Sequence, residues 1–131
     1  MLIAHLSDLH ITAPGRKAYG KVPTGDNLAR CVNHINNLSP QPDIVLVTGD
    51  VTFDGTAEET ALAGRLLGDL RMPWYVVPGN HDNPDTLKVL QHGWERAPMI
   101  RKESRGFDYF LSDFAVSLLG VDSSTRNSPG G

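Results

Sequence analysis

Acidic, imidazole and amide side chains occur in three short groups, and each group follows an apolar run. The groups are Asp8-Leu9-His10, Asp50, and Asn80-His81-Asp82. Carboxylate, imidazole and amide ligands without thiolate suit Mn, Fe, Zn or a comparable divalent cation. Asn, Asp and Gly are also ordinary loop residues, because they tolerate left-handed backbone angles and hydrogen-bond to their own main chain. Taken alone, the last group favours a plain loop, so the surrounding elements must decide between a loop and a metal site.

The apolar runs before these groups are typical of buried β-strands. They are "LIAHLS" (2–7), "DIVLVT" (43–48) and "WYVVP" (74–78). The second run is rich in β-branched residues and has no polar alternation, which indicates a strand covered on both faces, as in parallel sheets. We therefore expect the three strands to form a buried parallel sheet.

Helical patterns separate the predicted strands. Apolar residues at three- and four-residue spacing predict a helix over 26–38, with Thr24 or Asp26 as its N-cap. Thr56 and Glu59 form a capping-box pattern before a second helix. Alternating strands and helices predict an α/β fold with right-handed parallel crossovers.

The rest of the chain predicts one short helix and a hairpin. Asn83 or Asp85 is expected to begin a helix that runs to about Gln91. Segments 107–113 and 114–122 are expected to form two strands around a turn near Ser112 and Asp113.

The carboxyl ends of parallel strands lie on one edge of a sheet, where ligand sites form. The three groups are therefore expected to converge. Asp8 and His10, two residues apart, would face the same side of an extended segment. Asp50 has two oxygens and could bridge two ions if its strand lies between the others. Gly49 and Gly79 would allow a sharp turn or a close backbone approach beside these ligands.

The motifs "DLH", "GDVTFDG" and "PGNHD" resemble the first three blocks of the calcineurin-like metallophosphoesterases. The longer runs, including "HLSDLHIT" and "LLGVDSS", resemble the cyclic-nucleotide phosphodiesterase and glycerophosphodiesterase branch over residues 1–124. The resemblance implies the N-terminal half of the metallophosphoesterase α/β sandwich, with a parallel β-α-β-α-β core followed by a β-hairpin. We expect a single partial domain over residues 1–131, with the C-terminal half absent.

The resemblance also implies roles for the residues of the three groups. Asp8 and His10 would hold a first divalent metal ion, Asp50 would bridge two ions, and Asn80 would hold the second. Asn80 and His81 would contact the substrate, and His81 would be catalytic beside the phosphate. The implied reaction is hydrolysis of a phosphodiester, of the cyclic-nucleotide or glycerophosphodiester type, by a metal-activated hydroxide.

Asp82 would support His81 or its loop from outside the ligand set. The later family blocks, a G-H or H-H pair and a G-H-x-H, do not occur in this sequence, which leaves the first metal site better furnished than the second. His92 could replace a missing ligand, although it matches no family position. The alternative is therefore a weak or inactive fragment that binds metal or phosphate. A flavodoxin-like nucleotide binder is disfavoured, because no Gly-rich loop follows the first strand.

Composition limits the partners and the location. The net charge of −3, without a basic block, disfavours nucleic-acid polymers, and a small phosphodiester is the expected substrate. Cys31 is the only cysteine, which excludes an internal disulfide and a thiolate metal cluster. The N-terminal sequence has neither a signal h-region nor a membrane span, so we expect a cytoplasmic protein with no membrane partner. The absent second sheet would leave apolar surface bare, which predicts a homo-oligomer.

Overall fold

The computed structural model describes residues 1–93 and 107–124. The elements in chain order are β1 (Ile3–Ser7), α1 (Thr24–Asn36), β2 (Ile44–Thr48), α2 (Ala57–Leu67), β3 (Trp74–Val77), α3 (Pro84–Leu87), the 3₁₀ helix η1 (Lys88–Gly93), β4 (Tyr109–Leu111) and β5 (Leu118–Gly120). The expected β-α-β-α-β order followed by a hairpin is confirmed.

The three N-terminal strands form a parallel sheet in the order β1-β2-β3. Leu46 at the middle of β2 pairs with His5 on one side and Tyr75 on the other, so β2 is the central strand. Ile44, Val45 and Val47 are fully buried, as the continuous apolar run of β2 predicts. The central position of β2 places Asp50 between the ends of the two outer strands.

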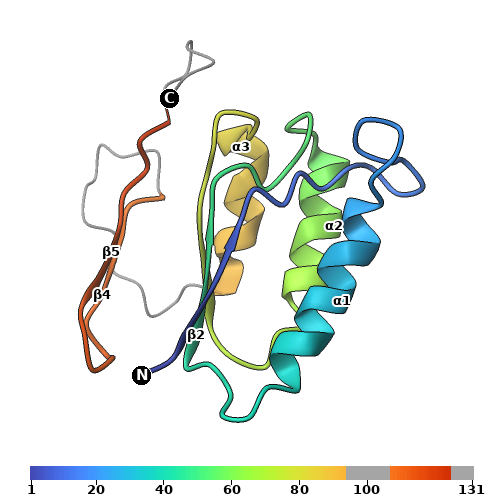
Figure 1. The fold of residues 1–131 in the computed structure, drawn as a ribbon. Coiled ribbons are helices and arrows are strands. Elements are labelled where there is room, and N and C mark those ends of the chain that lie inside the picture. Colours follow the sequence, from blue (N-terminus) through green and yellow to red (C-terminus); the bar gives the residue numbers. More distant parts are fainter. Residues whose placement is uncertain (94–106, 125–131) are drawn as a thin grey trace.

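The helices α1, α2 and α3 lie on one face of this sheet (Figure 1). The predicted capping box of α2 is confirmed, because Thr56 accepts from the Glu59 N–H and the Glu59 side chain accepts from the Thr56 N–H. Among the described residues, no helix is both long and apolar enough to cross a membrane.

The start of α1 differs from the prediction. The helix begins at Thr24, its N-cap position is Pro23, and no side chain caps it. Neither Thr24 nor Asp26 is the cap. The Thr24 hydroxyl instead accepts a hydrogen bond from the Thr12 N–H, at 3.3 Å, which ties the start of the helix to the loop after β1.

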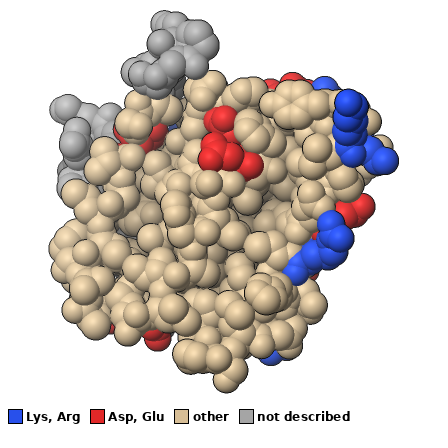
Figure 2. All heavy atoms as spheres, in the orientation of Figure 1, with Lys and Arg blue, Asp and Glu red and all other residues tan. Residues whose placement is uncertain are grey.

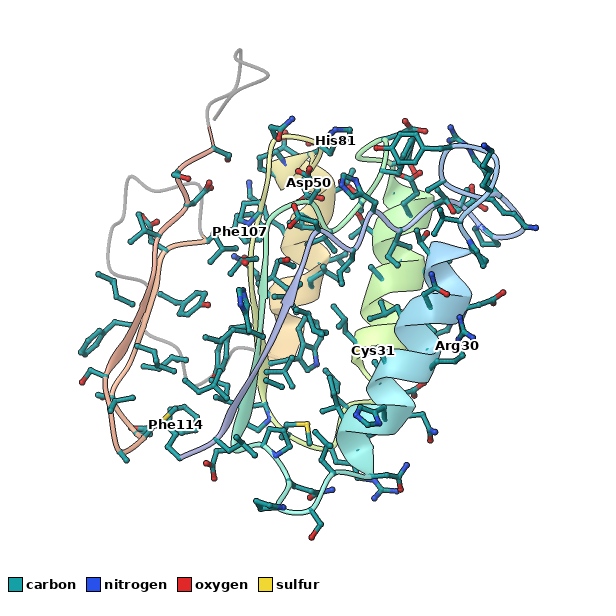
Figure 3. The ribbon with its side chains drawn as sticks, viewed as in Figure 1. Arg30, Cys31, Asp50, His81, Phe107 and Phe114 are labelled. Carbon is teal, nitrogen blue, oxygen red and sulfur yellow. The ribbon has the colours of Figure 1, made fainter. Side chains whose placement is uncertain are left out.

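The β4-β5 hairpin is antiparallel and lies across from the helices, on the other side of the parallel sheet (Figure 1). The rings of Tyr75 on β3 and Tyr109 on β4 lie 5.3 Å apart and link the two sheets. Phe107, which is fully buried, also lies between them (Figure 3). The two strands are shorter than predicted, and residues 112–117 connect them in place of a tight turn at Ser112 and Asp113.

Several large apolar side chains stay exposed on the hairpin and at the N-terminus. They are Met1, Leu2, Ile3, Phe110, Val116, Leu119 and Val121. Leu119 is 63% exposed although it lies within β5. This surface is of the kind that association between chains would cover.

Candidate metal centre

The structure brings residues from all three sequence groups to one end of the parallel sheet. His10, Asp50 and His81 each offer a ligand atom, and these atoms lie within 4.8 Å of one another. Asp50 and His81 are seen together where the strands end (Figure 3). The three segments converge because each follows a strand of the same parallel sheet.

The backbone after β1 stays paired with the backbone after β2. The Asp8 N–H donates to the Thr48 carbonyl at 3.1 Å, and the His10 N–H donates to the Asp50 carbonyl at 3.0 Å. The Ile11 N–H continues this pairing to Val51 at 2.9 Å. These bonds fix the His10 backbone against the Asp50 backbone before any ligand binds.

Asp8 and His10 do not lie in an extended segment, contrary to the expectation. Their φ angles are 52° and 45°, both in the left-handed region. This region is uncommon for residues other than glycine and costs about 1–3 kcal/mol where it is held. The expectation that residues two positions apart face the same side of a strand therefore does not apply here. The left-handed backbone at each residue sets the direction of its side chain.

Asp50 occupies the middle of the centre and is 8% exposed. Its Oδ1 accepts a hydrogen bond from the His81 N–H at 2.9 Å, and its Oδ2 lies 3.7 Å from Nε2 of His10. The carboxylate lies directly against Gly79, where an added Cβ would overlap Oδ1 and would lie 2.6 Å from the Asp50 nitrogen. Because Gly79 has no side chain, the Asp50 carboxylate can lie against the Gly79 backbone and reach both histidine segments.

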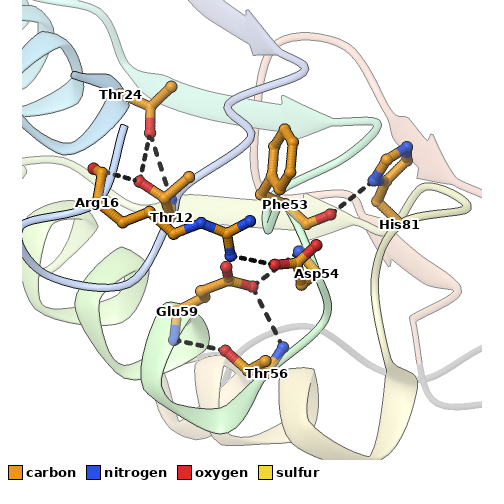
Figure 4. Close-up of polar contacts among 8 residues, drawn as sticks. All are labelled: Thr12, Arg16, Thr24, Phe53, Asp54, Thr56, Glu59 and His81. Atoms are coloured by element: carbon orange, nitrogen blue, oxygen red, sulfur yellow. Dashed lines mark hydrogen bonds and ion pairs between the residues drawn. The ribbon is translucent and has the colours of Figure 1, made fainter. Parts of the chain in front are cut away.

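The imidazole of His81 is held in one tautomer. Its Nδ1 lies 2.7 Å from the Phe53 carbonyl oxygen (Figure 4). A carbonyl only accepts, so Nδ1 carries a proton and Nε2 is the ring nitrogen left for a ligand or a substrate. The rings of His10 and His81 lie 5.0 Å apart and nearly perpendicular.

Asp8 and Asn80 lie at the margin of this group. Asp8 is exposed, and its Oδ1 lies over Gly49, 2.7 Å from the position a Cβ would take there. It does not belong to the set of ligand atoms within 4.8 Å of one another among the described residues. Asn80 is exposed and lines a cleft of about 530 Å³ between the parallel sheet and the hairpin. The side chain of His92 lies outside the described part of the structure.

Asp82 supports the loops and not the His81 ring. Its Oδ1 accepts from the Thr52 N–H at 2.8 Å and from the Thr52 hydroxyl at 2.6 Å. Its Oδ2 accepts from the N–H groups of Val51, at 3.0 Å, and Gly79, at 2.9 Å. The sequence did not single out Thr52, because only the folded loops bring it to Asp82.

Aromatic side chains also lie beside the centre, and the sequence did not predict them there. The Phe53 ring contacts His10 at 6.0 Å and Tyr19 at 5.1 Å between centroids. The Arg16 guanidinium lies 5.4 Å from the Phe53 centroid and pairs with Asp54 (Figure 4). Arg16 therefore anchors its loop next to the centre.

The donor set fits a divalent cation. One carboxylate and two imidazoles are a common ligand combination for Zn, Mn or Fe. Nδ1 of His10 is buried without a hydrogen-bond partner among the described residues, and burying such a group unpaired is costly. The carboxylate of Asp50 reaches this site only because Gly79 has no side chain. Three convergent ligand atoms suit a single ion.

Residues 1–126 match the family model described as calcineurin-like phosphoesterase, and the chain belongs to this family. A probable glycerophosphodiester phosphodiesterase of Arcobacter nitrofigilis is 39% identical over 128 residues, which are 96% of this chain and 45% of the relative. A glycerophosphodiester phosphodiesterase of Enterobacter lignolyticus is 37% identical over 95% of this chain and 44% of its own length. A probable cyclic nucleotide phosphodiesterase of a Pseudoalteromonas species is 33% identical, over 83% of this chain and 41% of the relative. The chain spans about half the length of the curated relatives it matches.

Proposed function

We propose that this chain furnishes the strand-end ligands of a metal-dependent phosphodiesterase that acts on cyclic nucleotides or glycerophosphodiesters. The observation that carries the proposal is the convergence of His10, Asp50 and His81, whose ligand atoms lie within 4.8 Å of one another. The printed names of the relatives support the reaction class. Bound divalent ions supply Lewis acidity and lower the pKa of a coordinated water.

In this proposal, Asp8 and His10 hold the first ion, Asp50 holds both, and Asn80 holds the second. The position of Asp50 supports a bridging role, because one carboxylate oxygen faces the His81 segment and the other faces His10. His81 acts on the substrate phosphate through Nε2, which stays available because Nδ1 is committed to Phe53. When Nε2 is protonated, the imidazolium there stabilises developing charge or delivers a proton to the leaving oxygen.

The test is hydrolysis of bis(p-nitrophenyl) phosphate by the purified chain with and without Mn²⁺. Turnover is expected to need the metal and to be lost in Asp50→Ala, because this variant removes the central carboxylate. Asp69→Ala is the matched control, since Asp69 is exposed and lies in the connection between α2 and β3, before the strand whose far end carries the centre. Turnover that is equal without metal would contradict the proposal.

A second candidate is a protein that binds a metal ion or phosphate without turnover. The observation in its favour is that the described residues gather one compact set of three ligand atoms, which suits a single ion. Calorimetric titration with Mn²⁺ separates the two candidates. Two ions and hydrolysis support the phosphodiesterase, whereas about one ion and no hydrolysis support the binding protein.

The proposed partner is a small phosphodiester, with no nucleic-acid polymer and no membrane. On the face drawn in Figure 2, Lys and Arg gather mainly over α1 and the loop before it, and one group of acidic side chains lies toward the strand ends, with others beside α1 and at the opposite edge. We further propose a homo-oligomer, supported by the exposed apolar residues of the hairpin, and a cytoplasmic location, supported by the lone Cys31. Light scattering and cell fractionation test these two proposals.

A further inference from the structure

The loops after β2 and β3 are joined by two carboxylates that work in opposite directions. Asp50, on the first loop, accepts the N–H of His81 on the second, at 2.9 Å. Asp82, on the second loop, accepts the N–H groups of Val51 and Thr52 on the first, at 3.0 and 2.8 Å. Each loop therefore donates backbone hydrogen bonds to the carboxylate of the other.

Thr52 adds a side-chain bond to this arrangement. It is fully buried, and its hydroxyl donates to Oδ1 of Asp82 at 2.6 Å. Oδ2 of Asp82 also accepts the Gly79 N–H at 2.9 Å. Each oxygen of Asp82 thus has two donors, which is the full acceptor capacity of a carboxylate. The four donors hold the carboxylate in one orientation, and the carboxylate in return holds the four donor groups in place.

We propose that Thr52 and Asp82 are positioning residues that set the separation of the two loops, and through it the affinity of the candidate centre for a divalent cation. This inference rests on the proposed metal site. The physical link is short: Asp50 is two residues from Thr52, and Asn80, a ligand in the proposed function, is two residues from Asp82. Loosening the bonds between Thr52 and Asp82 lets these two neighbours move apart. Partners of this kind, which orient ligands without touching the metal, typically change affinity by about ten- to hundredfold when removed.

Thr52→Val is the variant that tests the inference. Valine has the shape of threonine, so the buried site stays filled. It also keeps the backbone N–H but removes the hydroxyl donor. Thr52→Ser restores the hydroxyl and is the rescue variant. Thr60→Val is the matched control, because Thr60 is equally buried and its hydroxyl donates to the Thr56 carbonyl on α2, at 3.0 Å.

The first measurement is Mn²⁺ affinity by calorimetry, with Mn²⁺ alone as the probe. Thr52→Val is expected to lose about tenfold or more, whereas Thr52→Ser and Thr60→Val stay within about threefold of the parent chain. An affinity in Thr52→Val equal to that of the parent, or an equal loss in Thr60→Val at matched stability, would overturn the inference.

The second measurement is metal-free amide hydrogen exchange at Val51 and Gly79, whose N–H groups bind Asp82. We call the bonds between Thr52 and Asp82 the clamp. Faster exchange at both amides in Thr52→Val, and not in Thr60→Val, supports a clamp that holds the two loops together. Unchanged exchange in Thr52→Val overturns this role of the clamp. Absence of Mn²⁺ binding by the parent chain overturns the proposed metal site and the link from the clamp to affinity. Exchange would then still decide whether the clamp holds the two loops.

Discussion

Nδ1 of His81 donates a hydrogen bond to the carbonyl oxygen of Phe53, at 2.7 Å. Phe53 lies on the loop after β2, whereas His81 lies on the loop after β3. The backbone of one loop therefore selects the imidazole tautomer of the other. The sequence suggested that Asp82 would support His81 or its loop, and the Asp82 carboxylate binds the loops, through Thr52, Val51 and Gly79.

Replacing His81 by alanine tests its proposed action on the phosphate. If Nε2 serves the substrate, His81→Ala keeps Mn²⁺ affinity within about threefold and lowers phosphodiester hydrolysis by about 10²–10⁴-fold. Calorimetry and a steady-state assay measure the two effects. The control is His34→Ala, an exposed position on α1. A large loss of affinity would instead make His81 a metal ligand.

Gly79→Ala is expected to weaken metal binding at the centre and also to destabilise the fold. The new Cβ would overlap Oδ1 of Asp50 and lie 2.6 Å from its nitrogen, so the carboxylate must move. We expect Mn²⁺ affinity to fall by at least tenfold and stability to fall by about 1–3 kcal/mol, as for other overpacked sites. Gly25→Ala is the control, because its Cβ would meet only Leu62, at 3.6 Å. Normal Mn²⁺ binding by Gly79→Ala would argue against this placement of Asp50.

Thr56→Ala should destabilise the chain through the start of α2. It removes the side-chain oxygen that accepts the Glu59 N–H, and loss of such a cap costs about 0.5–2 kcal/mol. Urea unfolding monitored by circular dichroism measures the change. Thr56→Ser keeps the hydroxyl and should unfold near the parent midpoint. Equal losses in both variants would mean that the cap is not the cause.

Stability should fall at alkaline pH because of Tyr109. Burial, with a smaller contribution from Tyr75, raises the pKa of the Tyr109 hydroxyl to about 12, from an ordinary value near 10. The neutral form is favoured in the folded chain, so this contribution is fully present below about pH 10 and is lost as the pH rises toward 12. The slope for one group is at most about 1.4 kcal/mol per pH unit.

Urea unfolding at a series of pH values between 9 and about 12 measures this loss, and Tyr109→Phe is the control. The variant should show a flatter profile over that range, since it has no hydroxyl to ionise. Identical pH profiles for the two proteins would assign the alkaline loss to other groups.

The sequence by itself determined the elements and the three chemical groups. Local patterns suffice for these features: the β-branched run of β2 marks a strand that is buried on both faces, and Thr56 with Glu59 marks a helix start, because neighbours in the chain supply the interacting partners. The parallel order then requires the strand ends, with Asp50 among them, to meet at one edge.

Only the tertiary structure decided how these groups meet. The left-handed turns at Asp8 and His10, the pairing of Thr52 with Asp82, and the bond from His81 to Phe53 all depend on contacts between loops. Thr52 and Asp82 are separated by 30 residues. Their contact exists only because β2 and β3 lie side by side, and no local pattern in the chain specifies the distance or orientation at which their loops face each other.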